Sequence, residues 1–218
     1  MLFPLGIYVD LHNNTDLPIW QVVPLTALGC GIALGLVFGV TSLFRLPGER
    51  RIGKRARAVA VAAGDSSVYG GAVVYAAAAQ LFGEVQAGWN ARDRDRLARI
   101  SASGLWSDWS KRMDGYDAAG EHYRAEVLKG PHLDYVGLLA DREQVRLRVR
   151  AKMRRSLESN KGKRRALPGD RGRRNGFEEY WTLSRCDGEW ILWSTRSHRS
   201  RDKYITEPIV PEAAAHAV

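Results

Sequence analysis

Residue types that commonly carry catalysis or bind metals are scattered along this chain and form no recognised motif. The 218 residues contain no Walker phosphate-binding loop, no HExxH, no GxSxG and no CxxC pair. Neither Cys30 nor Cys186 has a histidine or a second cysteine at metal-ligand spacing, so we expect no metal site and no cofactor. The histidines are spread over the whole length: His12, His122, His132, His198 and His216.

A few polar residues could perform acid–base chemistry if the fold enclosed them in one pocket. The candidates are His122, Tyr123, Asp134, Tyr135 and Glu179. A carboxylate that is desolvated in such a pocket could act as a base in an isomerase or dehydratase. No spacing ties two of these residues to a common face, which favours positions at strand ends or in solvent. We therefore predict that the protein is not an enzyme, with a small-molecule-binding or isomerase-like domain as the alternative.

Basic residues form the strongest chemical pattern in the sequence. Between residues 142 and 174, fourteen Lys and Arg stand against three acidic residues, a net charge of +11 where the whole chain has +9. Like charges on one strand repel each other unless an anion lies opposite, so this stretch is predicted to bind an anionic partner. A basic run that is simply solvated is the alternative. The predicted partner- or lipid-binding residues are Arg146, Arg148, Arg150, Lys152, Arg154, Lys163, Arg164, Arg165, Arg173 and Arg174.

An uncharged segment near the N-terminus predicts a membrane anchor. Residues 17–44 contain no charged side chain. As a helix they would reach about 40 Å, enough to cross a hydrocarbon layer of about 30 Å. A secretory signal peptide would begin with positive charge, and a buried core helix rarely avoids charge for so long. We therefore predict one transmembrane helix, preceded by a short segment of residues 1–16.

Basic residues after this segment predict the orientation of the protein in the membrane. Six cations follow within a few turns and are expected to contact lipid headgroups: Arg45, Arg50, Arg51, Lys54, Arg55 and Arg57. Residues before the segment include acids but no Lys or Arg. The positive-inside rule then places the N-terminus outside the cell membrane and everything after Arg45 in the cytoplasm. Gly31, Gly35 and Gly39 form two overlapping GxxxG spacings, which predict helix association and a homo-oligomer.

Three kinds of anionic partner fit the basic stretch. Anionic lipid comes first, because the basic residues after the anchor hold the domain close to a bilayer. RNA or the ribosome comes second, through phosphate contacts that read no bases, although we do not favour nucleic acid as a partner. An unidentified acidic protein comes third. The first hypothesis is a non-enzymatic, membrane-tethered scaffold or adaptor, and a component of a membrane secretion or transport assembly is another alternative.

Local patterns predict an α+β domain over residues 65–205, between a basic linker (45–64) and a disordered tail (206–218). Caps at Asp65–Ser67 begin a helix that runs to about Trp89. Asp93 caps a short second helix, and Leu105 to Tyr116 form a third. About three helices would then pack on a curved antiparallel sheet of about four strands.

Alternating residues after Gly120 predict the strands. They are expected at His122–Leu128, Leu133–Leu139, Gln144–Met153, Phe177–Arg185 and Glu189–Thr195. The third of these should place apolar side chains on one face and a cationic ladder on the other. A flexible loop is expected from Ser156 to Asn175. Asp187-Gly188 predicts a tight hairpin in which Leu183 faces Leu192 and Trp181 faces Ser194.

Two stretches of this domain resemble a known fold. Gln80 to Leu97 reads QLFGEVQAGWNARDRDRL, and it looks like the first helix and turn of the cone-shaped fold named after nuclear transport factor two. Phe177 to Ser194 reads FEEYWTLSRCDGEWILWS and resembles the last hairpin of the family of the mitochondrial inner-membrane import subunit forty-four. The resemblance covers about Tyr75 to Ser197. It implies a membrane-associated scaffold for protein transport. The chain lacks that subunit's long N-terminal arm, so partner contacts of the arm are not carried over.

Overall fold

The computed structural model describes residues 48–65, 67–167 and 176–211. The chain divides into two units, Met1–Gly48 and Glu49–Val218, and the second contains the folded domain described below. The predicted span over residues 17–44, its three glycines and Arg45 lie outside the described residues. Among the residues that are described, no helix is long and apolar enough to cross a membrane.

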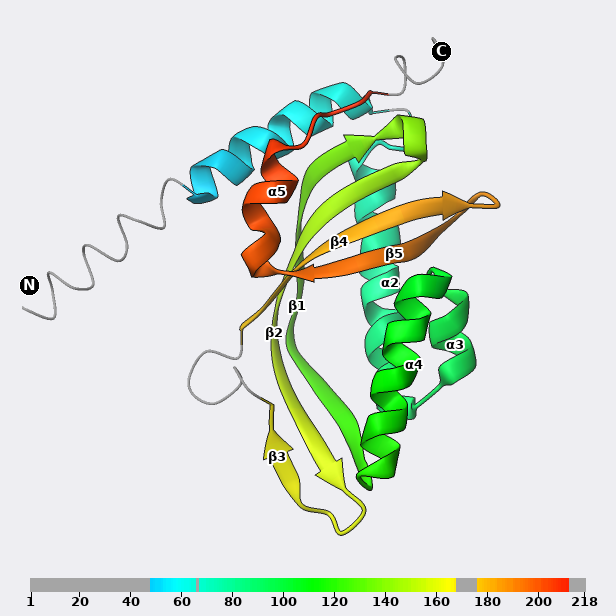
Figure 1. Cartoon of the computed structure of the whole chain (residues 1–218). Coiled ribbons are helices and arrows are strands. Elements are labelled where there is room, and N and C mark those ends of the chain that lie inside the picture. Colours follow the sequence, from blue (N-terminus) through cyan, green and yellow to red (C-terminus); the bar gives the residue numbers. More distant parts are fainter. Residues whose placement is uncertain (1–47, 66, 168–175, 212–218) are drawn as a thin grey trace, which may run out of the picture. The chain divides into compact units, whose positions relative to one another are not determined.

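The domain consists of helices packed on an antiparallel sheet, which confirms the predicted α+β class (Figure 1). A helix over residues 48–63, here called the collar helix, comes first. The other helices are α2 (Gly71–Ala91), α3 (Arg94–Arg99), α4 (Ser103–Ala118) and α5 (Arg201–Thr206). The strands are β1 (Glu121–Leu139), β2 (Gln144–Ser159), β3 (Arg164–Ala166), β4 (Gly176–Cys186) and β5 (Glu189–Ser197). They pair in the order β1-β2-β4-β5, and β3 pairs with β2.

The core lies between the sheet and helices α2 and α4. The apolar set of β2 alternates into this core as predicted, and Val145, Leu147 and Val149 are fully buried. Phe82 of α2 packs against Trp181 of β4, with ring centroids 5.9 Å apart. Burying such large apolar side chains is what holds helix and sheet together.

Asn90 joins the end of α2 to the edge of the sheet. Its carboxamide nitrogen donates to the Ala125 carbonyl at 2.8 Å, and its oxygen accepts from the Ala125 amide at 2.7 Å. A neighbouring strand would make the same pair of bonds, so Asn90 closes the edge of β1 at this point. Asp93 then caps α3 by accepting from the Arg96 amide at 2.9 Å, as predicted.

The start of α2 differs from the prediction. The helix begins at Gly71 with Gly70 as its N-cap residue, so Asp65 and Ser67 do not cap it. The Ser67 hydroxyl donates to the Ala63 carbonyl at 2.7 Å and accepts from the Tyr69 amide at 3.0 Å. Ser67 therefore lies at the end of the collar helix and not at the start of α2. Serine can take either position, because its hydroxyl can both donate and accept a hydrogen bond.

Strand β1 is continuous where two strands were predicted. Gly130 and Pro131 interrupt the pairing only as irregularities, with register shifts between Val127 and Lys129 and between Lys129 and His132. Proline lacks an amide hydrogen, so a strand tolerates it at a bulge.

The predicted loop from Ser156 is also partly wrong. Strand β2 continues to Ser159 and pairs with β3, while residues 168–175, which include Arg171, Arg173 and Arg174, lie outside the described residues.

The last hairpin and the C-terminal segment complete the sheet. Asp187 and Gly188 both have positive φ (52° and 86°), as the predicted two-residue turn requires. Leu183 faces Leu192 as predicted, but an irregularity at Thr182 and Leu183 makes Trp181 face Thr195 instead of Ser194. The tail was predicted to be disordered, yet Val210 bridges to Leu139 of β1.

Candidate functional site

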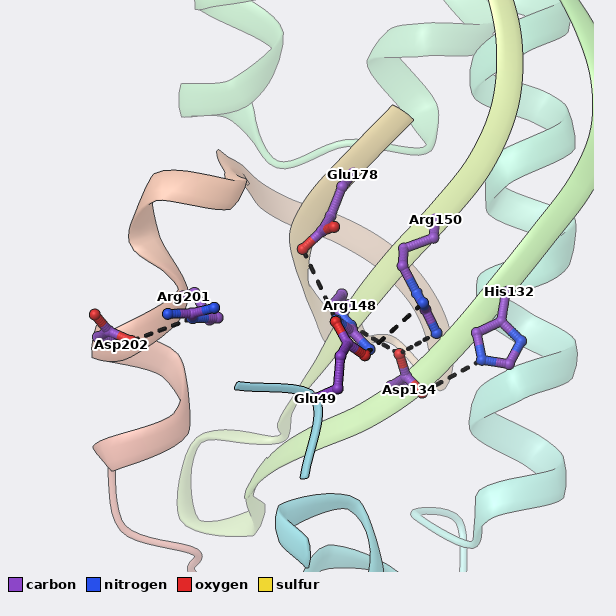
Figure 2. Close-up of polar contacts among 8 residues, drawn as sticks. All are labelled: Glu49, His132, Asp134, Arg148, Arg150, Glu178, Arg201 and Asp202. Atoms are coloured by element: carbon purple, nitrogen blue, oxygen red, sulfur yellow. Dashed lines mark hydrogen bonds and ion pairs between the residues drawn. The ribbon is translucent and has the colours of Figure 1, made fainter. Parts of the chain in front are cut away.

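The outer face of β2 carries the predicted cationic ladder, and the middle of that ladder is enclosed by the fold (Figure 2). Arg148 is 2% exposed. Its two terminal nitrogens bind both carboxylate oxygens of Glu49 at 2.8 and 2.9 Å, and its Nε donates to Asp134 at 2.8 Å. Glu178 of β4 lies 4.0 Å away. The guanidinium thus connects the collar helix to three strands.

The electrostatics of this cluster follow from burial and pairing. Burial alone would lower the pKa of Arg148, but hydrogen bonds and charges from Glu49 and Asp134 outweigh it, so the pKa is raised. The hydrogen bond from Arg148 lowers the pKa of Glu49, although partial burial acts in the opposite direction. Both groups are therefore held in their charged forms.

Neighbouring residues extend the cluster along the sheet. Arg150 donates to Asp134 at 3.2 Å, and His132 lies 3.5 Å from the same carboxylate. Arg201 of α5 pairs with Asp202 at 3.2 Å (Figure 2). The anions that the ladder requires are thus supplied by the chain itself.

The first ladder residue is enclosed in a similar way. Arg146 is an ion-pair partner of Glu207, directly after α5, and lies 5.0 Å over the Tyr204 ring. Arg55 of the collar helix donates to the carbonyls of Val136, at 2.8 Å, and Glu207. Burial lowers the pKa of Arg55 and of Arg146.

Three of the predicted binding residues lie inside the domain and not at the surface where they were expected. Arg146 and Arg148 were expected to meet a partner or lipid, but 12% and 2% side-chain exposure leaves them inside the domain. Arg55 was expected at lipid headgroups and instead points into the fold. The one signal in the sequence was Glu49, the single acid among the basic residues that follow the predicted span.

The rest of the collar helix has an outward basic face. Ile52 and Val59 are buried beneath the helix. The residues that face solvent include Arg50, Arg51, Lys54 and Arg57. Within residues 48–65, 67–167 and 176–211, none of these four cations has an ion-pair partner. Their charges are therefore available to an external anion.

A second basic surface lies where β1 and β2 extend past β4 and are joined by β3 (Figure 1). We call residues 121–129 and 152–167 the β-arm. It holds nine Lys and Arg against three Glu, a net charge of +6. Its predicted binding residues Arg154, Arg164 and Arg165 are exposed and pair with glutamates of the arm at 3.1, 3.6 and 2.9 Å.

The lysines of the β-arm are different from its arginines. All four are exposed, and none pairs with an acid in the part of the chain that the structure describes: Lys129, Lys152, Lys161 and Lys163. Two of them help to line a surface hollow of about 370 Å³, together with His132 and Arg150. The unpaired charge of the arm is therefore carried by lysine, and part of it lines a concave surface.

The five acid–base candidates do not meet in one site. His122 lies 3.8 Å from Glu158 on the β-arm, Asp134 belongs to the Arg148 cluster, and Tyr135 is 1% exposed in the core. Tyr123 and Glu179 share a cavity of about 150 Å³ between the helices and the sheet, and Tyr123 also lines a much smaller hollow with His122. Among the described residues no group of three or more His, Cys, Asp or Glu could hold a metal ion.

Comparison with known proteins identifies no relative by sequence. No protein-family model matches this chain, and no curated protein matches it. The structure is similar to the intermembrane space region of the chloroplast protein ARC6, with a TM-score of 0.45, 12% identity, and coverage of 55% of this chain and 92% of that chain.

Two bacterial proteins are also similar in structure. An IcmL-like type IV secretion system protein from Legionella pneumophila has a TM-score of 0.37 at 10% identity and covers 63% of this chain and 94% of its own. An uncharacterized Caulobacter vibrioides protein with a cystatin-like fold has a TM-score of 0.36 at 9% identity, with 59% and 94% covered. Because these TM-scores are low, the likenesses carry no inference about family or function. The resemblance to the import-subunit family stays a prediction.

Proposed function

We propose that this protein is a membrane-anchored, non-enzymatic adaptor whose cytoplasmic domain binds an acidic protein partner through the lysines of the β-arm. The observation that carries this proposal is the division of the basic residues into two groups. Arg146, Arg148 and Arg150 are neutralised by carboxylates of the same domain, whereas the arm lysines are exposed and unpaired within the described residues. Charge that is left without an internal partner is available for binding.

The collar helix supports attachment to a bilayer. In the sequence only residues 45–47 separate it from the predicted span, and its outward side presents Arg50, Arg51, Lys54 and Arg57. Each cation near an anionic leaflet contributes about 1 kcal/mol, so four would add a substantial attraction to that of the span. Because Ile52 and Val59 bury the other side of the helix against the domain, lipid contact would also orient the domain.

The β-arm has the composition of a protein-binding surface. Beside Lys129, the strand exposes 40% of Val127 and 42% of Leu128. Exposed apolar side chains next to unpaired charge are typical of interaction sites, because they combine desolvation with electrostatic selection. An acidic segment with apolar residues of its own fits this combination, and anionic lipid is the competing occupant.

The test replaces the four arm lysines by alanine in the full-length protein. We expect the wild type to capture an acidic partner from detergent-solubilised membranes, with recovery that falls as salt is raised. The variant should lose most of that partner. A matched control changes four exposed cations elsewhere in the domain, which leaves the net charge equal: Arg99, Lys111, Arg142 and Lys203. Equal capture of the partner by both variants would contradict the proposal. It would also be contradicted if the lysine variant still captured the partner and lost only its binding to anionic vesicles.

A further inference from the structure

A small cavity lies between α2, α4 and the inner face of the sheet. Its volume is about 150 Å³, and a cavity of this size holds one molecule as large as benzene. Six of its thirteen lining residues are aromatic: Trp89, Trp109, Tyr116, Tyr123, Phe177 and Trp181. Flat π surfaces on several sides favour a planar ring over an aliphatic chain.

Gln86 places an unsatisfied acceptor in this wall. The residue is 9% exposed, and its Oε1 has no hydrogen-bond partner among the residues that the structure describes. A buried carbonyl oxygen without a donor costs free energy, so native structures normally satisfy such atoms. Because Gln86 lines the cavity, a ligand with an N–H or O–H group could supply the missing donor.

Ionisable groups of both signs line the cavity. Glu179 accepts a hydrogen bond from the Trp181 indole at 3.0 Å, and burial raises the pKa of its carboxyl group. The charges of Arg155 and Arg112, which also line the cavity, act in the opposite direction on that carboxyl. These two guanidinium groups would repel a cationic ligand. They would attract an anionic one, but its charge would then lie beside Glu179 in a poorly solvated space. A neutral molecule avoids both penalties.

We propose that this cavity binds one neutral, single-ring aromatic molecule that donates an N–H or O–H hydrogen bond to Gln86 Oε1. The ring would lie among the aromatic side chains of α2, α4 and β4. None of the four β-arm lysines lines this cavity. A test of ligand binding here is therefore independent of the proposed adaptor function.

The test compares two probes of equal size that differ in one donor, para-fluorophenol and para-fluorotoluene. Their binding to the full-length protein in detergent is followed by the broadening and shift of the fluorine NMR signal. We expect para-fluorophenol to bind about tenfold more tightly after correction for its partition into detergent, because only its hydroxyl satisfies Gln86. Equal binding of both probes, or binding of neither, would overturn the proposal.

Two substitutions in α2 locate the binding to Gln86. Gln86→Leu removes the acceptor and should abolish the preference for the phenol while retaining or improving binding of para-fluorotoluene. Gln80→Leu is the control, because Gln80 lies on the same helix but is exposed and bonded to Glu84 at 2.8 Å. If Gln86→Leu does not fold, as judged by thermal unfolding, Gln86→Met is used in its place. A phenol preference that survives loss of the Gln86 acceptor would refute the proposal.

Discussion

At the scale of single residues, Arg148 owes its place to a partner that is far away in the sequence. Glu49 lies on the collar helix, 99 residues before Arg148, yet the two form a bidentate pair. Such pairs on buried guanidinium groups carry both energy and geometric precision. The pair therefore fixes the position of the collar helix on the sheet.

Replacing Glu49 by glutamine tests this pair through its pH dependence. Arg148 lowers the pKa of Glu49, so the carboxylate stabilises the fold above its unfolded pKa, and this stability is lost as pH falls through the lower folded value. Water screens the half-exposed carboxylate, so we expect Glu49→Gln to cost only about 1 kcal/mol near neutral pH. Urea unfolding from about pH 7 to about pH 3 should show the difference disappear.

The control for this measurement is Glu189→Gln. Glu189 is exposed and has no ion-pair partner among the described residues. Its substitution should change the free energy of unfolding little at any pH. A Glu49→Gln effect that is independent of pH would show that the ion pair does not stabilise the domain.

The sequence could predict which residues share a face but not what covers that face. Alternation in β2 correctly placed Arg146, Arg148 and Arg150 together, because the period of a strand is local. Their partners Glu49, Asp134 and Glu207 come from three other segments, and only the tertiary fold brings them together. For the same reason the sequence showed no sign of the cavity at Gln86 beyond Tyr123 and Glu179, two of the five acid–base candidates, which both line it.

At the scale of elements, local chemistry predicted the ends of some elements and missed others. The Asp187-Gly188 turn and the Asp93 cap were correct, because each depends on residues a few positions apart. The predicted break of β1 at Gly130 and Pro131 was wrong, because pairing with β2 on both sides keeps the strand continuous. Tertiary pairing there outweighs the local preference of proline and glycine.

Two glycines of α2 allow a matched test of how this helix packs. A Cβ at Gly88 would lie 2.8 Å from the side chain of Leu97, which is fully buried in α3, whereas a Cβ at Gly83 would meet nothing within 4 Å. We expect Gly88→Ala to destabilise the domain by about 1–3 kcal/mol through overpacking. Gly83→Ala should stabilise it by up to about 1 kcal/mol, because alanine favours the helix.

Thermal or urea unfolding of the two alanine variants measures the change in the free energy of unfolding that each substitution causes. Opposite signs for the two substitutions would confirm close packing of α2 on α3. If both variants gained stability, the close approach of Leu97 to Gly88 would be contradicted.

At the scale of the whole molecule, positive charge is distributed over two surfaces and one buried cluster. The cluster is neutralised internally and holds the collar helix to the sheet. The outward face of that helix and the lysines of the β-arm carry unpaired charge within the described part of the chain. This distribution suits a domain that is held at one anionic surface and binds a second anionic partner.

The central claim is that this domain lies in the cytoplasm, attached to a membrane, and Cys186 gives the most direct measurement. Cys186 is exposed, and a Cys30→Ser variant leaves it as the one cysteine of the chain. Intact cells are treated with a membrane-impermeant maleimide, and the same reagent is applied after lysis. We predict that Cys186 reacts only after lysis and that the protein sediments with membranes. Labelling of Cys186 in intact cells, or recovery of the full-length chain in the soluble fraction, would contradict this account.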